Sequence, residues 1–105
     1  MLNHVLLAKL KSDLPTTAVE ELMVESRIRL LKIPEVMNLR CGKKIADSDP
    51  YDFFISMDVE NTGKLKVVEQ SAIYLQFRHQ VFDPKVESSL QSSFEMEPGK
   101  DVRYS

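Results

Sequence analysis

The chain has few of the residues that mark specialised protein classes. Among 105 residues it has one cysteine, Cys41, and three glycines. One cysteine cannot form a disulfide within the chain, so this is not a disulfide-stabilised scaffold. Three scattered glycines provide no glycine-rich phosphate-binding loop. The chain also has no long apolar run and no secretory leader pattern, and these absences predict a cytosolic protein without a membrane partner.

Charge and histidine content exclude further classes. Fourteen basic and sixteen acidic side chains give a net charge of −2. No basic stripe is therefore available to neutralise phosphates, and no nucleic-acid partner is expected. The two histidines, His4 and His79, lie far apart and share no metal-ligand spacing with other residues, so neither a metal nor a cofactor is predicted. Asp47 and Asp49 are predicted to lie in a polar turn, because no glutamate follows them at calcium-loop spacing.

What the chain does have is the composition of an ordinary globular domain, with 43% hydrophobic and 29% charged residues. Its length fits one domain, which we predict to span residues 1–97, followed by a polar tail over residues 98–105. A domain this small leaves much apolar surface exposed unless it pairs with a copy of itself. Cys41 is expected to be a small buried hydrophobic side chain rather than a nucleophile.

Hydrophobic spacing divides the domain into six elements. Strands are predicted over residues 2–11, 36–45, 51–60 and 89–97, where apolar side chains alternate or run continuously. Helices are predicted over residues 17–33 and 61–77, where apolar side chains recur at helical spacing. The order β-α-β-β-α-β is that of a ferredoxin-like α+β domain, in which an antiparallel four-stranded sheet carries its helices on one face.

The two helices carry further local signals. Thr17 and Glu20 fit a capping box at the start of the first helix, and Pro34 is expected to end that helix near Ile33. Its acidic residues precede its basic residues, the order that the helix dipole favours. The first helix is predicted to bury Val19, Leu22, Met23, Ser26, Leu30 and Ile33. The second is predicted to bury Leu65, Val68, Ala72, and Leu75 or Gln76.

The first strand is apolar on both faces. Val5 and Leu7 lie on one face, and His4 and Leu6 lie on the other, whereas a sheet with one wet face alternates apolar and polar residues. We therefore expect a second copy of the chain to cover the open sheet face. The product would be a homodimer whose two sheets form a dimeric α/β barrel. A monomer with a wet sheet face is the alternative. Within the second strand, Gly42 predicts a bulge or a close backbone approach.

Four segments of the chain resemble stress-responsive A/B barrel domains, in the same order and at the same spacing. This family of dimeric α/β barrels includes plant heat-stable stress proteins and olivetolic acid cyclase. The segments are NHVLLAKLKSDL, LLKIPEVMNLRCGKKI, YDFFISMDVEN and AIYLQFRHQVF. The resemblance covers residues 2–97. It implies a homodimer with a small cavity in each subunit, between the sheet and the helices.

The resemblance also implies site residues. In the cyclase, a histidine of the second helix region acts as general base with the help of a tyrosine, and this histidine falls on His79. The family's next phenylalanine falls on Phe82, and its first-strand histidine falls on His4. The family's tyrosine falls on Ile73, one position before Tyr74. Three further motif positions of the family are occupied by other residue types here, namely Phe53, Gln76 and Phe77.

Three functions remain open from the sequence. The first is a dimer that binds a small hydrophobic or aromatic metabolite in a cavity. The second is a cyclase or isomerase in which His79 is the general base at the cavity edge, with His4, Tyr51 or Tyr74 as donor to the developing oxyanion. The third is a structural, stress-stable dimer in which both histidines only pack. The candidate ligand-binding residues are His4, Phe53, Ile55, Met57, Tyr74 and Phe82.

Overall fold

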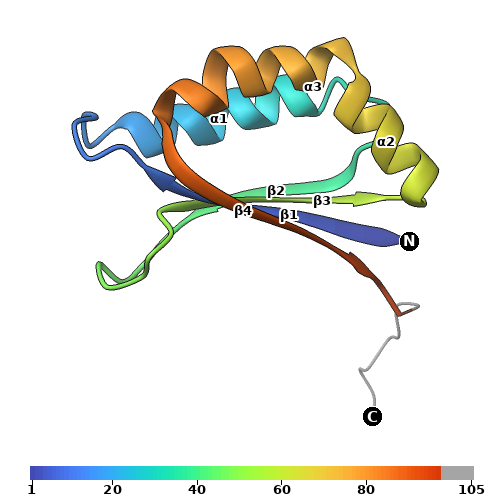
Figure 1. Cartoon of the computed structure of the whole chain (residues 1–105), viewed down its shortest axis with the longest axis horizontal. Helices are drawn as coiled ribbons and strands as arrows, with labels where there is room; N and C mark the ends of the chain where they lie inside the picture. The colour runs from blue at the N-terminus through green and yellow to red at the C-terminus, as the bar shows by residue number, and fades with distance from the viewer. Residues whose placement is uncertain (98–105) are drawn as a thin grey trace.

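The computed structural model describes residues 1–97. Helices cover one face of a four-stranded sheet and leave the other face open (Figure 1). The predicted order of elements and the ferredoxin-like fold class are confirmed. The predicted tail, residues 98–105, lies outside the described residues. The elements in chain order are β1 (Leu2–Leu10), α1 (Ala18–Leu30), β2 (Met37–Lys43), β3 (Phe53–Val59), α2 (Thr62–Gln70), α3 (Ala72–Phe77), the π-helical turn η1 (Arg78–Phe82), the 3₁₀ turn η2 (Asp83–Lys85) and β4 (Val86–Glu95).

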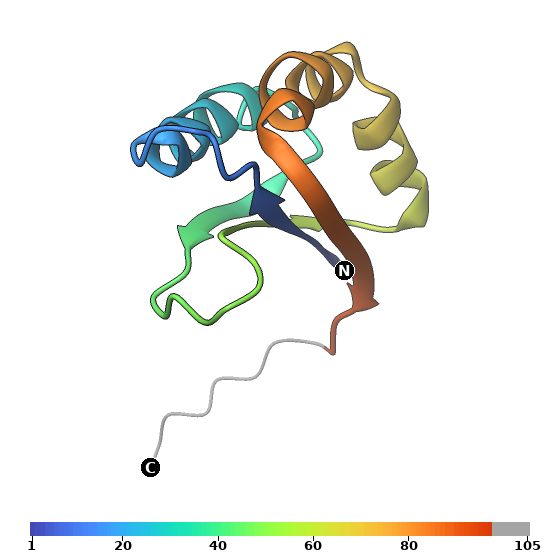
Figure 2. The same ribbon diagram turned by 60° about the vertical axis from the view of Figure 1, so that its left-hand side comes forward.

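The sheet has the strand order β2-β3-β1-β4, and every neighbouring pair is antiparallel. Strand β1 lies inside the sheet, between β3 and β4, whereas β2 and β4 are the edges (Figure 2). The register places His4 beside Met57 of β3 and Ser93 of β4. Within residues 1–97, no helix is both long enough and apolar enough to cross a membrane.

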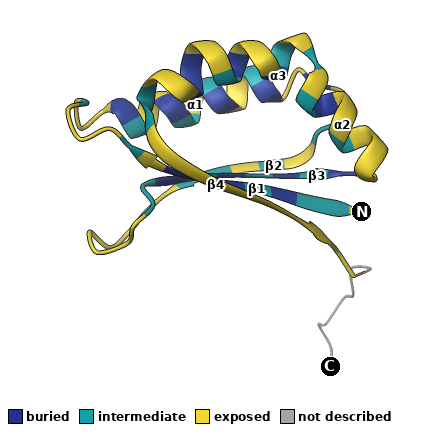
Figure 3. Ribbon diagram, viewed as in Figure 1, coloured by how far each residue is buried: buried dark blue, intermediate teal, exposed yellow. Residues whose placement is uncertain are grey.

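The helix-covered face of the sheet contains the core. On β1, His4, Leu6 and Ala8 are buried, and on β3 the residues from Phe53 to Val59 alternate between buried and half-buried. This alternation confirms the predicted faces of both strands. Figure 3 shows the same division in the helices, which are buried toward the sheet and exposed on their outer side. Helix α1 buries Leu22, Ser26, Leu30 and, just after its end, Ile33, whereas Val19 and Met23 are half-buried against the core.

The predicted capping box of α1 is wrong. Thr17 is the N-cap residue, but its side chain makes no capping hydrogen bond. The Glu20 carboxylate reaches across to β2 instead, where it accepts a hydrogen bond from the Lys43 ammonium at 2.5 Å. A charged partner thus competes successfully with the backbone N–H that a capping box would use. The helix itself ends at Leu30, before the predicted Ile33.

The predicted second helix is divided at Ser71, and the buried face predicted for its second half is wrong. Ser71 has extended backbone angles (φ −67°, ψ 147°). Its hydroxyl donates to the Val68 carbonyl at 2.7 Å and accepts from the Tyr74 N–H at 3.2 Å. One side chain therefore ends α2 and caps α3, which starts in a new rotational phase. Tyr74 and Phe77 are buried, whereas Ala72, Leu75 and Gln76 are exposed.

Strand β2 departs from regular pairing near its start. The register with β3 shifts between Met37 and Arg40, and Asn38 has a positive φ of 50°. Asparagine tolerates this left-handed conformation better than most residues. Neither alternative predicted at Gly42 is correct: its pairing with Phe54 is regular, and the group that a Cβ atom there would collide with is the side-chain ring of Phe54. At the other end of the chain, β4 begins at Val86, ahead of the predicted residue 89.

Candidate functional site

His4 is a buried polar side chain on the helix-covered face of the sheet. Only 3% of the residue is exposed. Its Nδ1 shares a hydrogen bond with the Ser93 hydroxyl across the β1–β4 pair, at 2.6 Å. Its Nε2 is buried and has no hydrogen-bond partner among residues 1–97. One ring nitrogen is thus fixed, and the other is free to donate or accept according to the tautomer.

Burial lowers the pKa of His4 below its ordinary value, and the nearby Arg78 charge lowers it further, whereas Glu69 acts in the opposite direction. The charged imidazolium is disfavoured because the interior cannot solvate it. Since histidine ordinarily titrates near pH 6.5, His4 is neutral at pH 7. A neutral imidazole with one unoccupied nitrogen can bind a polar ligand group or accept a proton.

Tyr74 and Arg78 lie one helical turn apart and form the polar part of the helix layer above the sheet. Arg78 Nη1 donates to the Tyr74 hydroxyl at 3.4 Å, and Arg78 Nε lies 3.4 Å from the Asp83 carboxylate. The guanidinium carbon stands 4.8 Å from the centroid of the Phe82 ring, a cation–π contact. Burial raises the pKa of Tyr74, so its hydroxyl stays protonated as a donor at neutral pH.

These side chains form one electrostatic group. The charges of Glu69 and Arg78 act on the imidazole of His4 and on the phenol of Tyr74 alike. We call the group the His4 cluster; it comprises His4, Glu69, Tyr74, Arg78 and Ser93. Its members come from β1, α2, α3, η1 and β4, and hydrogen bonds join His4 to Ser93 and Arg78 to Tyr74. A buried imidazole, a protonated phenol and a guanidinium are suited to hold an oxygen-bearing ligand.

Six of the seven sequence-predicted site residues are buried in the core. They are His4, Phe53, Ile55, Met57, Tyr74 and Phe82. Met57 is the β3 neighbour of His4 in the sheet register. Phe82 packs on Phe77, with 5.9 Å between their ring centroids. The apolar side chains predicted to surround a ligand therefore lie in one core with the His4 imidazole.

His79 does not join this group. It is exposed, although the sequence predicted it at a cavity edge between helix and sheet. It lies in η1, where the π-helical turn buries Val81 and Phe82 and leaves His79 and Gln80 outside. The wider turn changes which residues face the sheet, and an ungapped comparison of sequence cannot detect that.

Sequence reasoning missed Glu69, Arg78 and Ser93. Arg78 carried the only available signal, because it follows Tyr74 by one helical turn and is therefore on the same face. Glu69 and Ser93 gave no signal, since Ser93 reaches His4 only through strand pairing and Glu69 acts on it only through its charge. Five surface hollows of residues 1–97 are lined by residues other than His4, Tyr74 and Arg78. His4 and Tyr74 are only 3% and 4% exposed, so the His4 cluster is closed to solvent at these two side chains.

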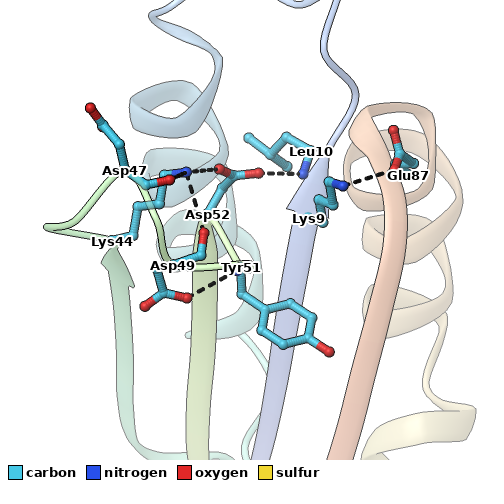
Figure 4. A network of polar contacts seen from close by, with 8 residues as sticks. All are labelled: Lys9, Leu10, Lys44, Asp47, Asp49, Tyr51, Asp52 and Glu87. Atoms are coloured by element: carbon cyan, nitrogen blue, oxygen red, sulfur yellow. Dashed lines mark hydrogen bonds and ion pairs between the residues drawn. The ribbon is translucent and has the colours of Figure 1, made fainter.

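A second polar network lies in the loop between β2 and β3 (Figure 4). The Lys44 ammonium lies 2.9 Å from the Asp52 carboxylate and donates to the backbone carbonyls of Asp47 and Asp49. Burial alone would raise the pKa of Asp52, but the Leu10 N–H, which donates to it at 2.8 Å, and Lys44 together lower it. The turn predicted at Asp47 and Asp49 is present, and the lysine occupies its carbonyls.

Cys41 is half-buried on the helix-covered side of β2. Burial raises the pKa of its thiol, and Arg27 only partly opposes this. A raised pKa keeps the sulfur protonated, whereas a nucleophile requires the thiolate. Cys41 therefore packs against the core as predicted, although it is half-buried rather than buried.

No protein-family profile matches the chain, and no curated protein is similar to it. Solved structures are similar over nearly its whole length. A DABB-family protein with a ferredoxin-like fold from Mesorhizobium loti is 18% identical, with a TM-score of 0.80 over 92% of this chain and 97% of that one. A dimeric ferredoxin-like protein of unknown function from Thermobifida fusca is 16% identical, with a TM-score of 0.79 over 90% of each chain.

Hydroxynitrile lyase from Passiflora edulis is 13% identical, with a TM-score of 0.79 over 95% of this chain and 96% of that one. At such identities the likeness is one of fold. The chain has the ferredoxin-like fold of these proteins, and the fold implied by the resemblance to stress-responsive A/B barrel domains is confirmed.

Proposed function

We propose that the protein is a homodimer that binds a small aromatic acid at the His4 cluster. The observation that carries the proposal is the Nε2 atom of His4, which is buried without a hydrogen-bond partner among residues 1–97. An unsatisfied buried polar atom costs about 1–3 kcal/mol of stability. A ligand that offers a hydroxyl or carboxyl group to this atom removes the cost, so the empty state favours binding.

The surroundings define the ligand class. Phe53, Ile55, Met57 and Phe82 are apolar walls that suit a ring. Tyr74 and Arg78 offer donors to an oxygen, and the Arg78 charge favours an anion over a neutral group. Because the cluster is closed, the ligand enters through a local opening of the helix layer. The π-helical turn η1 is the segment best suited to open, since π-helical hydrogen bonding is rare and frequently found at functional sites.

The homodimer is supported by the open face of the sheet. Half-buried Leu7 and Phe54 lie there beside Leu90 and Phe94, which are 51% and 56% exposed. Apolar side chains gathered on one sheet face are typical of an interface. A second copy that packs sheet against sheet covers them with the same residues of its own, as an isologous contact requires. The Thermobifida fusca protein of the same fold is described as dimeric.

A thermal-shift measurement with benzoate, salicylate and 4-hydroxybenzoate tests the ligand site. We compare the wild type with His4→Gln and with His79→Ala, which changes an exposed histidine as a matched control. A ligand at ten times its dissociation constant stabilises by about 1.4 kcal/mol, which raises the midpoint by roughly 6–11 °C in a chain of this size. The shift is expected in the wild type and in His79→Ala and is lost in His4→Gln. A shift that survives in His4→Gln, or no shift with any of the acids, contradicts the proposal.

An enzyme is the second candidate, supported by the buried His4 imidazole, which is neutral and has an Nε2 without a partner among residues 1–97. A neutral imidazole at pH 7 can take a proton from carbon next to a carbonyl, with Tyr74 and Arg78 as donors to the enolate oxygen. His4 is better placed for this role than the exposed His79. Deuterium exchange into acetophenone, followed by NMR, measures the proton transfer directly. Exchange is expected with the wild type and His79→Ala but not with His4→Gln; loss of exchange in His79→Ala would return the role to His79.

A further inference from the structure

The outer side of α1 carries an apolar row that the fold does not use. Val24, Ile28 and Leu31 recur at helical spacing and are 43%, 49% and 60% exposed. The opposite side of the same helix buries Leu22 and Leu30. The outer surface of the helix layer is exposed in Figure 3. Single exposed apolar residues are common on protein surfaces, but three large ones in one row form a patch that is typical of an interaction site.

Two hollows adjoin the row, and Glu25 lines both of them. A groove of about 330 Å³ separates α1 from α3, and Ile28 and Ile73 are its apolar lining. A second hollow, of about 410 Å³, lies beside Val24 and extends to Lys85. Helices pack by placing the ridge of one into the groove of the other. The outer side of α1 therefore has both parts that a contact between two identical helices requires.

The charges beside the row determine the direction of such a contact. At helical spacing Glu21, Glu25 and Lys32 fall on the same flank of the row, with the acidic residues first. When two helices pack antiparallel about a twofold axis, the same flank of each helix meets in reverse order. Glu25 of each copy then approaches Lys32 of the other. A parallel twofold contact would instead bring this flank against the opposite flank of the other helix, so Glu25 and Lys32 would not meet. The helix dipole also favours this charge order, but it does not account for the exposed apolar row.

We propose that a second copy of this chain docks on the outer side of α1, with the two α1 helices antiparallel and Ile28 near the twofold axis. The contact is isologous, like the proposed contact between sheets, but it lies on the opposite side of the subunit (Figure 1). Two different isologous contacts on one subunit build an assembly larger than a dimer. The α1 contact does not depend on the ligand site, whereas an assembly larger than a dimer also requires the proposed sheet contact.

Sedimentation velocity from micromolar to millimolar chain tests the contact. The wild type is expected to form species larger than a dimer, and Ile28→Glu is expected to stop at the dimer. A charge placed in an apolar contact should raise the dissociation constant of this step about tenfold or more. Val67→Glu is the matched control, because Val67 is 47% exposed on α2, outside the row. Wild type that never exceeds a dimer, or equal loss in Val67→Glu, overturns the proposal.

Charge reversal tests the antiparallel direction. Glu25→Lys and Lys32→Glu each place like charges across the contact and are expected to weaken it. Mixing the two variants, or combining both changes in one chain, restores opposite charges and is expected to restore the larger species. Failure of both combinations to restore it overturns the antiparallel arrangement.

The variant Leu90→Lys separates this contact from the one between sheets. It disrupts the contact between sheets and leaves α1 unchanged, so this variant is expected to form only the dimer that the α1 contact holds. Adding Ile28→Glu is expected to remove that dimer as well. A dimer that persists in this double variant contradicts the α1 contact, and a Leu90→Lys assembly identical to the wild type contradicts the sheet contact alone.

Discussion

The two faces of the sheet are made from the same strands but have different compositions. On β3, Phe53 faces the helices and is 2% exposed, whereas its neighbour Phe54 faces the open side and is half-buried. The helix-covered face is apolar apart from the His4 region. The open face mixes apolar residues with a polar group, in which the Asn3 and Asn38 amides both donate to the Asp58 carboxylate.

This difference shows how one sheet serves two purposes. The helix-covered face supplies the stability of the subunit, because its side chains are removed from water within the chain. The open face is only partly removed from water and becomes an interior surface when a second copy covers it. Its polar group is satisfied within the subunit, since the hydrogen bonds of Asn3 and Asn38 lower the pKa of Asp58. A carboxylate that is already paired can enter an interface at a smaller cost.

The largest effect is expected from the two adjacent phenylalanines. Phe53→Ala removes a buried ring and should lower the free energy of unfolding by about 3–5 kcal/mol. Phe54→Ala is the matched control on the other face and should cost only about 1–2 kcal/mol. Urea denaturation of both variants measures the difference. Equal costs would mean that the two faces contribute alike to the subunit, contrary to the comparison.

Gly42→Ala should have the next largest effect. The new Cβ would collide with the Phe54 ring on the open face, and such overpacking costs about 1–3 kcal/mol. The same change in a Phe54→Ala background meets no ring and should cost little. A double-mutant cycle from urea denaturation gives the coupling energy, and a coupling near zero would show that the ring does not lie over Gly42.

Ser71→Ala should have a smaller effect on the helix-covered side. It removes the hydroxyl that caps α3 and should cost about 1 kcal/mol. Since this cap sets the rotation of α3 that buries Tyr74, the variant should also reduce the rise in melting temperature caused by a ligand at the His4 cluster. Ser88→Ala on the exposed part of β4 is the control. Thermal unfolding in the presence and absence of salicylate measures both consequences, and an unchanged ligand shift would show that the cap does not position Tyr74.

The mildest prediction concerns pH. The pKa of His4 is lower in the folded chain than the ordinary value near 6.5. Between the two values the unfolded chain binds more protons, so the stability provided by neutral His4 is complete above about pH 6.5 and is lost as pH falls toward the folded value. Urea denaturation from neutral to mildly acidic pH should show this loss in the wild type and in His79→Ala. The loss should be absent in His4→Gln, and parallel curves for wild type and His4→Gln would contradict the assignment.

Much of the fold could be predicted from the sequence because the strong patterns are local. Alternation on β1 and β3 and helical spacing on α1 each depend on residues close in the chain. The failures have physical causes that lie elsewhere. Glu20 binds Lys43 from a distant strand instead of completing a capping box. Ser71 divides one predicted helix into two, and a change of phase at a single residue alters every face that follows it.

The candidate site was predicted less completely, because it depends on that phase and on long-range contacts. His4 and the walls on β3 could be predicted, since they lie on regular strands. The π-helical turn at η1 moved His79 to the surface and left Tyr74 and Arg78 as the polar groups of the helix layer. Ser93 joined through strand pairing, which local spacing does not determine.

We propose that the buried His4, not the exposed His79, is the functional histidine. Nitrogen NMR of the two imidazoles, recorded with and without salicylate, tests it most directly. We predict that the Nε2 signal of His4 moves as salicylate is added, while the signals of His79 stay in place. Movement of the His79 signals alone, or no movement of either histidine at saturating salicylate, would contradict the claim.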